Sequence, residues 1–194
     1  IGAVQMNLFG YLYTEEELKG FKNENASLIL SEDGKTLGKI FDENRTNISF
    51  EDLPEYLINA LIATEDVRYF EHEGVDSKGL LRVLLKSIIL QKKSAGGGST
   101  ISQQLVKNMY GRKSFGFLTM PVNKTKEAIL AIRIENAYNK QEILGLYFNT
   151  VPFGENVYGI EAASRRFYNK KVGSLSLDES AVLVGLLKAN TYYN

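Results

Sequence analysis

Apolar residues recur every three or four positions through most of the chain after residue 52, which is the spacing of a buried helix face. The first such stretch predicts a helix over residues 52–67, with Pro54 in the first turn, where proline is tolerated. Its buried face is formed by four residues: Leu57, Ile58, Leu61 and Ile62. The next position on that face is occupied by Glu65, where the pattern favours another apolar residue.

Further helices are predicted from periodicity and from start signals. A helix over residues 77–91 carries leucine and isoleucine on one face and most of its basic residues on the other. Later helices begin at capping boxes, in which an N-cap side chain and a Gln or Glu three positions later bond each other's backbone N–H groups. These boxes are Thr100-x-x-Gln103, Asn139-x-x-Glu142 and Ser176-x-x-Glu179. The aperiodic stretch from Gly111 to Val122 is predicted to be a connector.

Before residue 52 the pattern changes. Residues 27–41 alternate around Asp33-Gly34, a pair typical of tight turns, which predicts a β-hairpin. We therefore expect a mainly α fold with a short N-terminal β-hairpin appendage, divided into a membrane-proximal linker over residues 1–51 and a helical domain over residues 52–194. The opening stretch IGAVQMNLFGYLY is either the segment just outside an excised membrane anchor or an ordinary first core segment, and both interpretations stay open.

Composition narrows the chemistry. The 194 residues contain 23 basic and 23 acidic side chains and no cysteine, which excludes disulfides and thiolate sites. No apolar run reaches the roughly 18 residues of a membrane span. Residues 77–126 contain no Asp or Glu but ten basic residues: Lys78, Arg82, Lys86, Lys92, Lys93, Lys107, Arg112, Lys113, Lys124 and Lys126. This asymmetry favours an anionic partner, whether phosphates of a membrane, a nucleic acid or a substrate, although any single lysine could simply be solvated.

Three groups of residues are candidates for catalysis or binding: Glu65, the pair of Lys124 and Glu127, and the stretch over residues 96–108. A carboxylate such as Glu65 at an inward helix position is costly unless it is paired, and such groups serve as general acids and bases. The structural alternative is that Glu65 caps a helix or pairs with Arg68 or with His72, the sole histidine. Lys124 and Glu127 share a face of a largely apolar helix, where they form either a salt bridge or part of a site.

The stretch GGGSTISQQLVKN adds a third group. It places Thr100, Gln104 and Lys107 on one helix face, directly after glycines that let backbone amides approach an anion. It is not a Walker loop, because the Lys-Ser/Thr pair after the last glycine is absent.

Five ordered stretches resemble the sequence blocks of the peptidoglycan glycosyltransferases found in class A penicillin-binding proteins and their monofunctional relatives. They are EDVRYFEHEG, GGSTISQQLVKN, NKTKE, YFNTVPFGENVYGIEAAS and LSLDESAVLVGLLKAN. The resemblance covers residues 52–194. It implies a lysozyme-like helical domain on the outer, periplasmic face of the bacterial cytoplasmic membrane, anchored by a preceding segment. There it would polymerise lipid II into β-1,4 glycan strands and contribute to cell shape.

The resemblance also implies roles for single residues. Glu65 would be the general base, Asp66 would support it, and Glu127 would complete the catalytic set. Glu127 would also hold a divalent cation, Mg or Mn, or orient lysines near the pyrophosphate. The implied substrate-binding residues are Ser99, Thr100, Gln103, Gln104, Lys107, Asn108, Lys124 and His72. The implied membrane contacts are Phe115, Phe117 and Leu118.

The implied partners are lipid II, the growing glycan strand, the membrane surface and a transpeptidase domain in a longer chain, with no nucleic acid. The Ser-x-x-Lys, Ser-x-Asn and Lys-Thr-Gly motifs of a transpeptidase do not occur here, and an ending just after the fifth block suggests a truncated C-terminus. Two other functions stay open at this point. One is a lysozyme-like hydrolase or lytic transglycosylase, and the other is a non-catalytic cell-wall scaffold.

Three residues depart from the blocks, and the mildest change is Ser102 in place of Thr. Tyr69 stands where the family usually has Phe, so its hydroxyl needs a partner if it is buried. Asn123 replaces the arginine of the third block, which removes one cation from the leaving-group site. Arg112, Lys113 or Lys126 could substitute for that cation.

Overall fold

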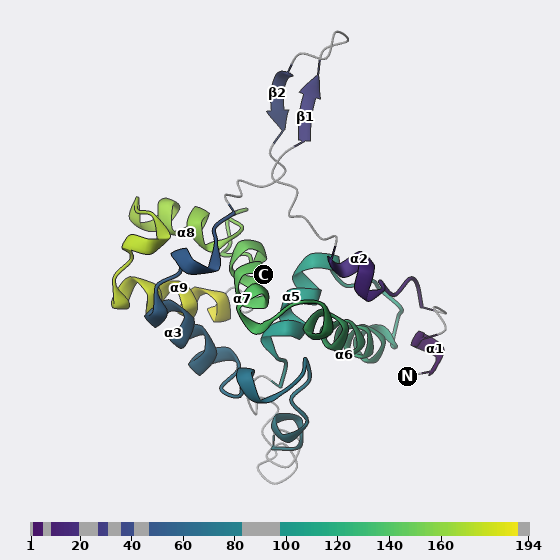
Figure 1. The fold of residues 1–194 in the computed structure, drawn as a ribbon. Helices are drawn as coiled ribbons and strands as arrows, with labels where there is room; N and C mark the ends of the chain where they lie inside the picture. The colour runs from purple at the N-terminus through teal and green to yellow at the C-terminus, as the bar shows by residue number, and fades with distance from the viewer. Residues whose placement is uncertain are drawn as a thin grey trace. The chain divides into compact units, whose positions relative to one another are not determined.

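The computed structural model describes residues 2–5, 9–19, 27–30, 36–40, 47–82 and 98–189. The labelled helices are α1 (Gly2–Gln5), α2 (Glu15–Lys19), α3 (Glu55–Glu65), α5 (Ile101–Tyr110), α6 (Thr119–Ala137), α7 (Lys140–Thr150), α8 (Ile160–Tyr168) and α9 (Leu177–Ala189) (Figure 1). Single 3-10 turns occur at Phe50–Asp52, Tyr69–Glu71 and Val172–Ser174. This part of the chain is mainly α, which confirms the predicted class.

Two predicted elements are only partly described. Residues 77–82 are helical, and the rest of the helix predicted over residues 77–91 lies outside the described residues. The strands β1 (Ser27–Leu30) and β2 (Thr36–Ile40) pair antiparallel, with Ser27 opposite Ile40. The turn predicted at Asp33-Gly34 lies outside the described residues, so the hairpin stays a prediction.

The chain divides into two compact units. The first consists of Ile1–Phe21 and Leu61–Ile143, and the second of Lys22–Ala60 and Leu144–Asn194. Helices α3 and α7 each contribute residues to both units.

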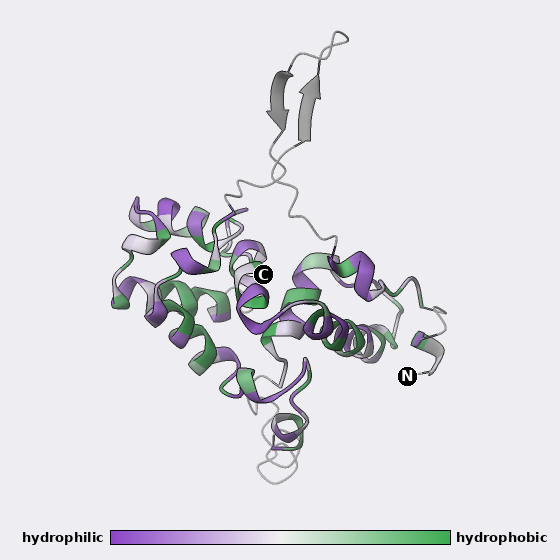
Figure 2. Ribbon diagram, viewed as in Figure 1, coloured by the Kyte–Doolittle hydropathy of each residue, from purple (hydrophilic) through white to green (hydrophobic). Residues whose placement is uncertain are grey.

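The first unit is built on α6, which packs against α1, α2 and α5. Apolar and hydrophilic residues alternate around the turns of α6 (Figure 2). The apolar residues of α5 and α6 that face this core are fully or almost fully buried: Ile101, Leu105, Leu130, Ala131 and Ile134. Burial of the Leu and Ile side chains contributes about 1.5–3 kcal/mol each, so this packing holds α5 in place.

The N-terminal segment belongs to this unit as well. Leu18 of α2 is fully buried, and the Tyr138 hydroxyl donates to its carbonyl at 2.8 Å. Tyr13 stacks on Tyr110 with ring centroids 4.2 Å apart. Within the opening stretch, Val4 and Leu12 are buried and Tyr11 and Tyr13 are exposed, and both interpretations of this stretch stay predictions.

The second unit contains α8, which packs against α9. Glu161 of α8 is buried, and it accepts hydrogen bonds from the Val172 backbone N–H at 2.8 Å and from Arg165 at 2.7 Å. The Asn149 amide holds both backbone groups of Ile48, at 3.0 and 2.9 Å. Glu161 and Asn149 are thus two buried polar side chains, and each bonds the backbone of a segment that is distant in the sequence.

All three predicted capping boxes form. In the first, the Thr100 hydroxyl accepts from the Gln103 backbone N–H at 3.2 Å and the Gln103 side chain accepts from the Thr100 N–H at 3.1 Å. The pairs Asn139 with Glu142 and Ser176 with Glu179 show the same reciprocal bonds. Helices α5, α7 and α9 therefore begin where the sequence predicted.

The connector prediction was wrong at its C-terminal end. Helix α6 begins at Thr119, so the connector covers only residues 111–118. Pro121 falls in the first turn of α6, where its missing N–H costs nothing. The Thr119 hydroxyl accepts from the Phe115 N–H at 2.7 Å and donates to the Gly116 carbonyl at 2.7 Å, which closes the connector onto the helix.

Candidate active site

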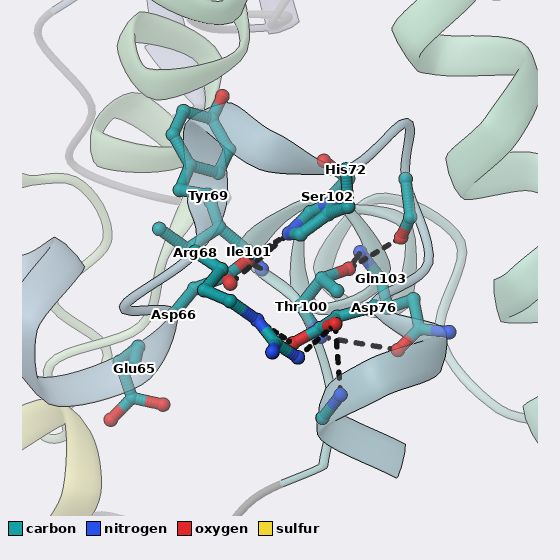
Figure 3. Close-up of polar contacts among 12 residues, drawn as sticks. Glu65, Asp66, Arg68, Tyr69, His72, Asp76, Thr100, Ile101, Ser102 and Gln103 are labelled. Carbon is teal, nitrogen blue, oxygen red and sulfur yellow. Dashed lines mark hydrogen bonds and ion pairs between the residues drawn. The ribbon is translucent and has the colours of Figure 1, made fainter. Parts of the chain in front are cut away.

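Asp66 ties the end of α3 to the start of α5. Its carboxylate is buried and accepts a hydrogen bond from the Ile101 backbone N–H at 3.0 Å, and it meets His72 Nε2 at 3.0 Å (Figure 3). The Thr100 hydroxyl donates to the Gly74 carbonyl at 2.6 Å, which adds a second tie between the same segments. The carboxylate fills the site where a helix N-terminus favours negative charge.

Behind His72 lies a network that the sequence analysis did not predict. Lys140 donates to the His72 carbonyl at 2.6 Å and to Glu135 at 2.8 Å, and the Ser102 hydroxyl donates to Glu135 at 2.6 Å. The hydroxyl of fully buried Tyr69 donates to the Lys140 carbonyl at 2.8 Å. Burial raises the pKa of Tyr69, so this hydroxyl keeps its proton.

Tyr69 therefore has the partner that a buried hydroxyl requires. Residues of this network are far apart in sequence and carry no shared motif, so no signal in the sequence pairs them. The network holds the loop that carries His72, and through the Asp66 carboxylate it supports the position of α5.

Glu65 is the last residue of α3 and is half-buried. Its carboxylate points away from the Asp66–His72 pair (Figure 3). The Gln104 side-chain amide donates to Glu65 Oε2 at 2.9 Å. A pocket of about 110 Å³ opens beside it, lined among others by Glu65, Arg68, Arg82, Ser99 and Thr100. The structure thus brings together two residues predicted for the site, one from α3 and one from α5.

Glu127 is the centre of a group of cations. It is buried, and its two carboxylate oxygens meet Arg112 Nε at 2.7 Å and Lys124 Nζ at 2.8 Å. Lys124 also donates to the Ser99 hydroxyl at 2.7 Å. The predicted pair of Lys124 and Glu127 therefore exists, and Arg112 joins it.

The pKa of Lys107 is affected by both acidic residues, Glu65 and Glu127. Burial lowers the pKa of Lys107, the charges of Arg112 and Lys124 lower it further, and Glu127 and Glu65 act in the opposite direction. Lys107 forms no ion pair with another described residue. A half-buried cation of this kind favours an incoming anion.

A larger, mainly apolar pocket of about 690 Å³ adjoins the cations. Lys124, Ser99 and Gln103 line it together with apolar residues, which are Val75, Leu80, Ala128, Ile129 and Ile132. Leu80 and Ile132 are exposed. This combination of an apolar wall and an ammonium group fits an amphiphile with an anionic head.

The contacts of Glu127 do not fit a divalent ion. Both of its oxygens are already paired with cations, and the described residues contain no group of three or more Asp, Glu, His or Cys side chains that could hold a metal. Hard divalent ions require several oxygen ligands. The Mg or Mn prediction therefore has no ligand set in the described ranges.

Several residues predicted to bind substrate are engaged in the protein instead. Thr100 and Gln103 are buried in their capping box, and the His72 side chain is 6% exposed against Asp66. Asn108 is half-buried on α5. Their roles toward substrate stay predictions.

The residues predicted to contact the membrane differ in exposure. Phe117 is 92% exposed, and Met120 beside it is 54% exposed. Phe115 packs edge-on against Phe9 with centroids 5.6 Å apart, and Leu118 is partly buried. No helix in the described ranges is long and apolar enough to cross a bilayer.

The fold and site define a class: a mainly helical protein in which one carboxylate, Glu65, is held by Gln104 beside a pocket and a second, Glu127, is paired with two cations. The chain belongs to the transglycosylase family, whose model matches residues 33–194. This confirms the family resemblance.

Relatives support the assignment along the chain. Penicillin-binding protein 1F of Bacillus subtilis is 37% identical over 194 residues, covering 100% of this chain and 26% of the relative. Penicillin-binding protein 1A of Pseudomonas aeruginosa is 40% identical over 184 residues, covering 92% of this chain and 21% of the relative. That of Haemophilus influenzae is 38% identical over 169 residues, covering 86% and 19%. The chain thus spans about a quarter or less of the length of these relatives.

Proposed function

We propose that this chain is a peptidoglycan glycosyltransferase that polymerises lipid II into β-1,4 glycan strands. Family membership supports the reaction class. The observation that carries the proposal is the 2.9 Å hydrogen bond from Gln104 of α5 to the Glu65 carboxylate, with Lys107 three residues further along the same helix. Helix α5 thus carries a cation and, through Gln104, holds the base at the end of α3, and transfer from a diphosphate donor requires both groups.

Glu65 takes the proton from the 4-hydroxyl of the acceptor sugar. The resulting oxygen attacks the anomeric carbon of the donor, the bond from that carbon to the diphosphate breaks, and the diphosphate leaves with the bonding electron pair. Attack from the opposite side converts the α-linked donor into a β-1,4 product. Diphosphate is a good leaving group, so positive charge from Lys107 and Lys124 stabilises it without a strong acid.

Gln104 keeps the Glu65 carboxylate in place, and Asp66 acts through α5 as a positioning residue. Glu127 holds Lys124. The apolar pocket next to Lys124 suits a lipid-linked substrate, and Phe117 and Met120 suit contact with a membrane surface. The proposal includes a lysozyme-like fold, a place at the periplasmic face of the membrane and a transpeptidase domain in a longer chain.

The cations distinguish this proposal from a glycan hydrolase or lytic transglycosylase. Cleavage of a glycosidic bond needs an acid to protonate a poor leaving group, whereas the surplus of positive charge here suits an anionic one. A non-catalytic scaffold has no use for a carboxylate held by Gln104 beside an open pocket.

Incubation with labelled lipid II in detergent, with and without EDTA, tests the function. Glu65→Gln is expected to lower glycan formation by at least about 100-fold, the low end for a positioned base. Glu73→Gln, a change at an exposed residue, serves as the matched control. A near-normal rate of Glu65→Gln refutes the base assignment, and cleavage of preformed glycan by the wild type supports the hydrolase instead.

A further inference from the structure

Three stretches of the chain line the pocket beside Glu65. They are residues 64–68 at and after the end of α3, residues 76–82 at the start of the next helix, and residues 98–100 just before α5. The first and third stretches are tied together by Asp66, whose carboxylate accepts from the Ile101 N–H at 3.0 Å. The pocket keeps its shape only if the second stretch is tied to the others as well.

An ion pair between Arg68 and Asp76 ties the second stretch to the first (Figure 3). The guanidinium donates from Nε to Asp76 Oδ2 at 3.2 Å and from Nη2 to Oδ1, so both carboxylate oxygens are engaged. A two-point contact between planar groups fixes direction as well as distance. Because Arg68 lies three residues after Glu65, the pair connects the stretch that carries Glu65 to the helix over residues 77–82.

Asp76 also caps the helix that begins after it. Its Oδ1 accepts from the Gly79 N–H at 2.9 Å, and its backbone carbonyl accepts from the Leu80 N–H at 2.9 Å. Burial of Asp76 favours the neutral acid, but the hydrogen bonds from Arg68 and from the Gly79 N–H outweigh burial and lower the pKa of Asp76. The carboxylate is therefore charged at neutral pH, and it serves both the ion pair and the helix start.

Gly79 leaves room for the ion pair. A Cβ built on Gly79 would lie 2.2 Å from Asp76 Oδ2 and 3.2 Å from Arg68 Nη2. An added methyl group would therefore displace the pair. Glycine is a poorer helix residue than alanine, so the sequence places a weak helix former at the position where the pair lies.

We propose that Arg68 and Asp76 are positioning residues that hold the Glu65 carboxylate at its place in the pocket. The catalytic meaning of that place rests on the proposed function. Gln104 bonds one oxygen of Glu65, and the direction of the side chain also depends on the backbone at the end of α3. The ion pair holds that backbone through Arg68. Arg68 and Asp76 also line a second pocket of about 390 Å³, so the pair forms a wall that two pockets share.

Steady-state polymerisation of labelled lipid II tests the positioning role in variants that urea unfolding shows to be folded. Arg68→Ala is expected to lower kcat by about 10- to 100-fold, as for a reacting group displaced by roughly 1 Å, and to change KM by less than about twofold. Asp76→Asn still caps the helix but loses the charge, and it is expected to lower kcat by about 3- to 30-fold. Arg68→Lys keeps the charge without the two-point contact and is expected to recover part of kcat. Unchanged kcat in Arg68→Ala, or a rise in KM alone, overturns the role.

Gly79→Ala separates positioning from stability. Alanine favours the helix, so the urea midpoint of this variant is expected to equal or exceed that of the wild type, while the displaced pair lowers kcat about as much as Arg68→Ala does. Arg166→Ala is the matched control, because it removes an arginine from an exposed ion pair with Glu155 in the other compact unit. It is expected to leave kcat within about twofold of the wild type. A wild-type kcat in Gly79→Ala overturns the inference.

The double variant Arg68→Ala/Asp76→Asn tests whether the two residues act as a unit. Residues that act through one contact are not additive, so the double variant is expected to have a kcat no lower than that of Arg68→Ala alone. Effects on kcat that multiply overturn the joint role of the pair.

Hydrogen exchange separates failure of this inference from failure of the proposed function. In Arg68→Ala, exchange at the Gly79 and Leu80 amides is expected to be at least about 10-fold faster than in the wild type, with no change in Arg166→Ala. If the wild type forms no glycan but exchange in Arg68→Ala is faster, the proposed function fails and the pair still fixes the pocket wall. If the wild type forms glycan and Arg68→Ala matches it in exchange and in kcat, the function stands and the positioning role fails.

Discussion

Removing the Asp66 carboxylate should cost more stability than removing Glu65, although the two residues are neighbours in sequence. The Asp66 side chain is buried and accepts from the Ile101 N–H and from His72 Nε2. A carboxylate only accepts hydrogen bonds, so Nε2 carries the proton, and the buried Nδ1 has no partner among the described residues. The change Asp66→Ala therefore leaves two interior donors without an acceptor.

The magnitude follows from these two bonds. A buried donor that loses its acceptor costs about 1–3 kcal/mol, so Asp66→Ala should lower the free energy of unfolding by about 2–6 kcal/mol. Asp66→Asn keeps the volume and one acceptor oxygen, and should cost about half as much. Glu65 is half-buried and bonds only an amide, so Glu65→Gln should change stability by under about 1 kcal/mol while removing activity.

Urea denaturation followed by circular dichroism measures these differences. Asp178→Ala, at an exposed residue in the first turn of α9, is the control and should cost only a few tenths of a kcal/mol. If Asp66→Ala is as stable as this control, Asp66 does not support the start of α5, and the positioning role assigned to it is wrong.

Two further outcomes are expected. Gly74→Ala should lower the free energy of unfolding by about 2–5 kcal/mol, because a Cβ at φ of +86° would lie 2.6 Å from the Ala131 carbonyl carbon. Gly111→Ala is the control, because its added Cβ would meet nothing within 4 Å. It should cost only the roughly 1–2 kcal/mol that a φ of +65° imposes, and thermal or urea unfolding measures both variants. Equal costs would contradict the close approach. The second outcome concerns the ratio of the pyrophosphate affinity of the wild type to that of Lys107→Arg. Because the pKa of Lys107 is lowered from 10.5 and arginine stays charged, this ratio should begin to fall at a pH below 10.5 as the lysine loses its proton. A ratio that stays constant up to pH 10.5 contradicts a role for the lysine charge.

The helix starts could be predicted because their causes are local. A capping box involves four consecutive residues, and all three predicted boxes form in the structure. The apolar stripe of the first predicted helix is correct in part: Leu57 and Leu61 are fully buried, whereas Ile58 and Ile62 are half-buried. Helix α3 covers Glu55–Glu65 and is shorter than the predicted range of residues 52–67. The start of α6 was missed because Pro121 and the aperiodic residues before it gave no start signal, whereas the Thr119 hydroxyl supplies one only once the connector has folded.

The contents of the site were partly predictable. Chemistry-bearing residue types at fixed spacing identified Glu65, Gln104, Lys107, Lys124 and Glu127, and the structure places them in one unit. The sequence could not show that Asp66 and His72 pair with each other in the interior. The direction of a side chain at the end of a helix depends on the conformation of the loop that follows. The pattern of apolar and polar residues does not predict that conformation.

The replacement at Asn123 illustrates why residue identity alone misleads. A loss of charge at this position suggests a weaker anion site, yet the shorter amide binds both backbone groups of Lys113 and leaves Arg112 beside Glu127. An arginine at position 123 could not accept from the Lys113 N–H, because a guanidinium only donates. The number of cations around Glu127 is thus set by where the connector returns to α6, and Asn123 and Gly111 together determine that return.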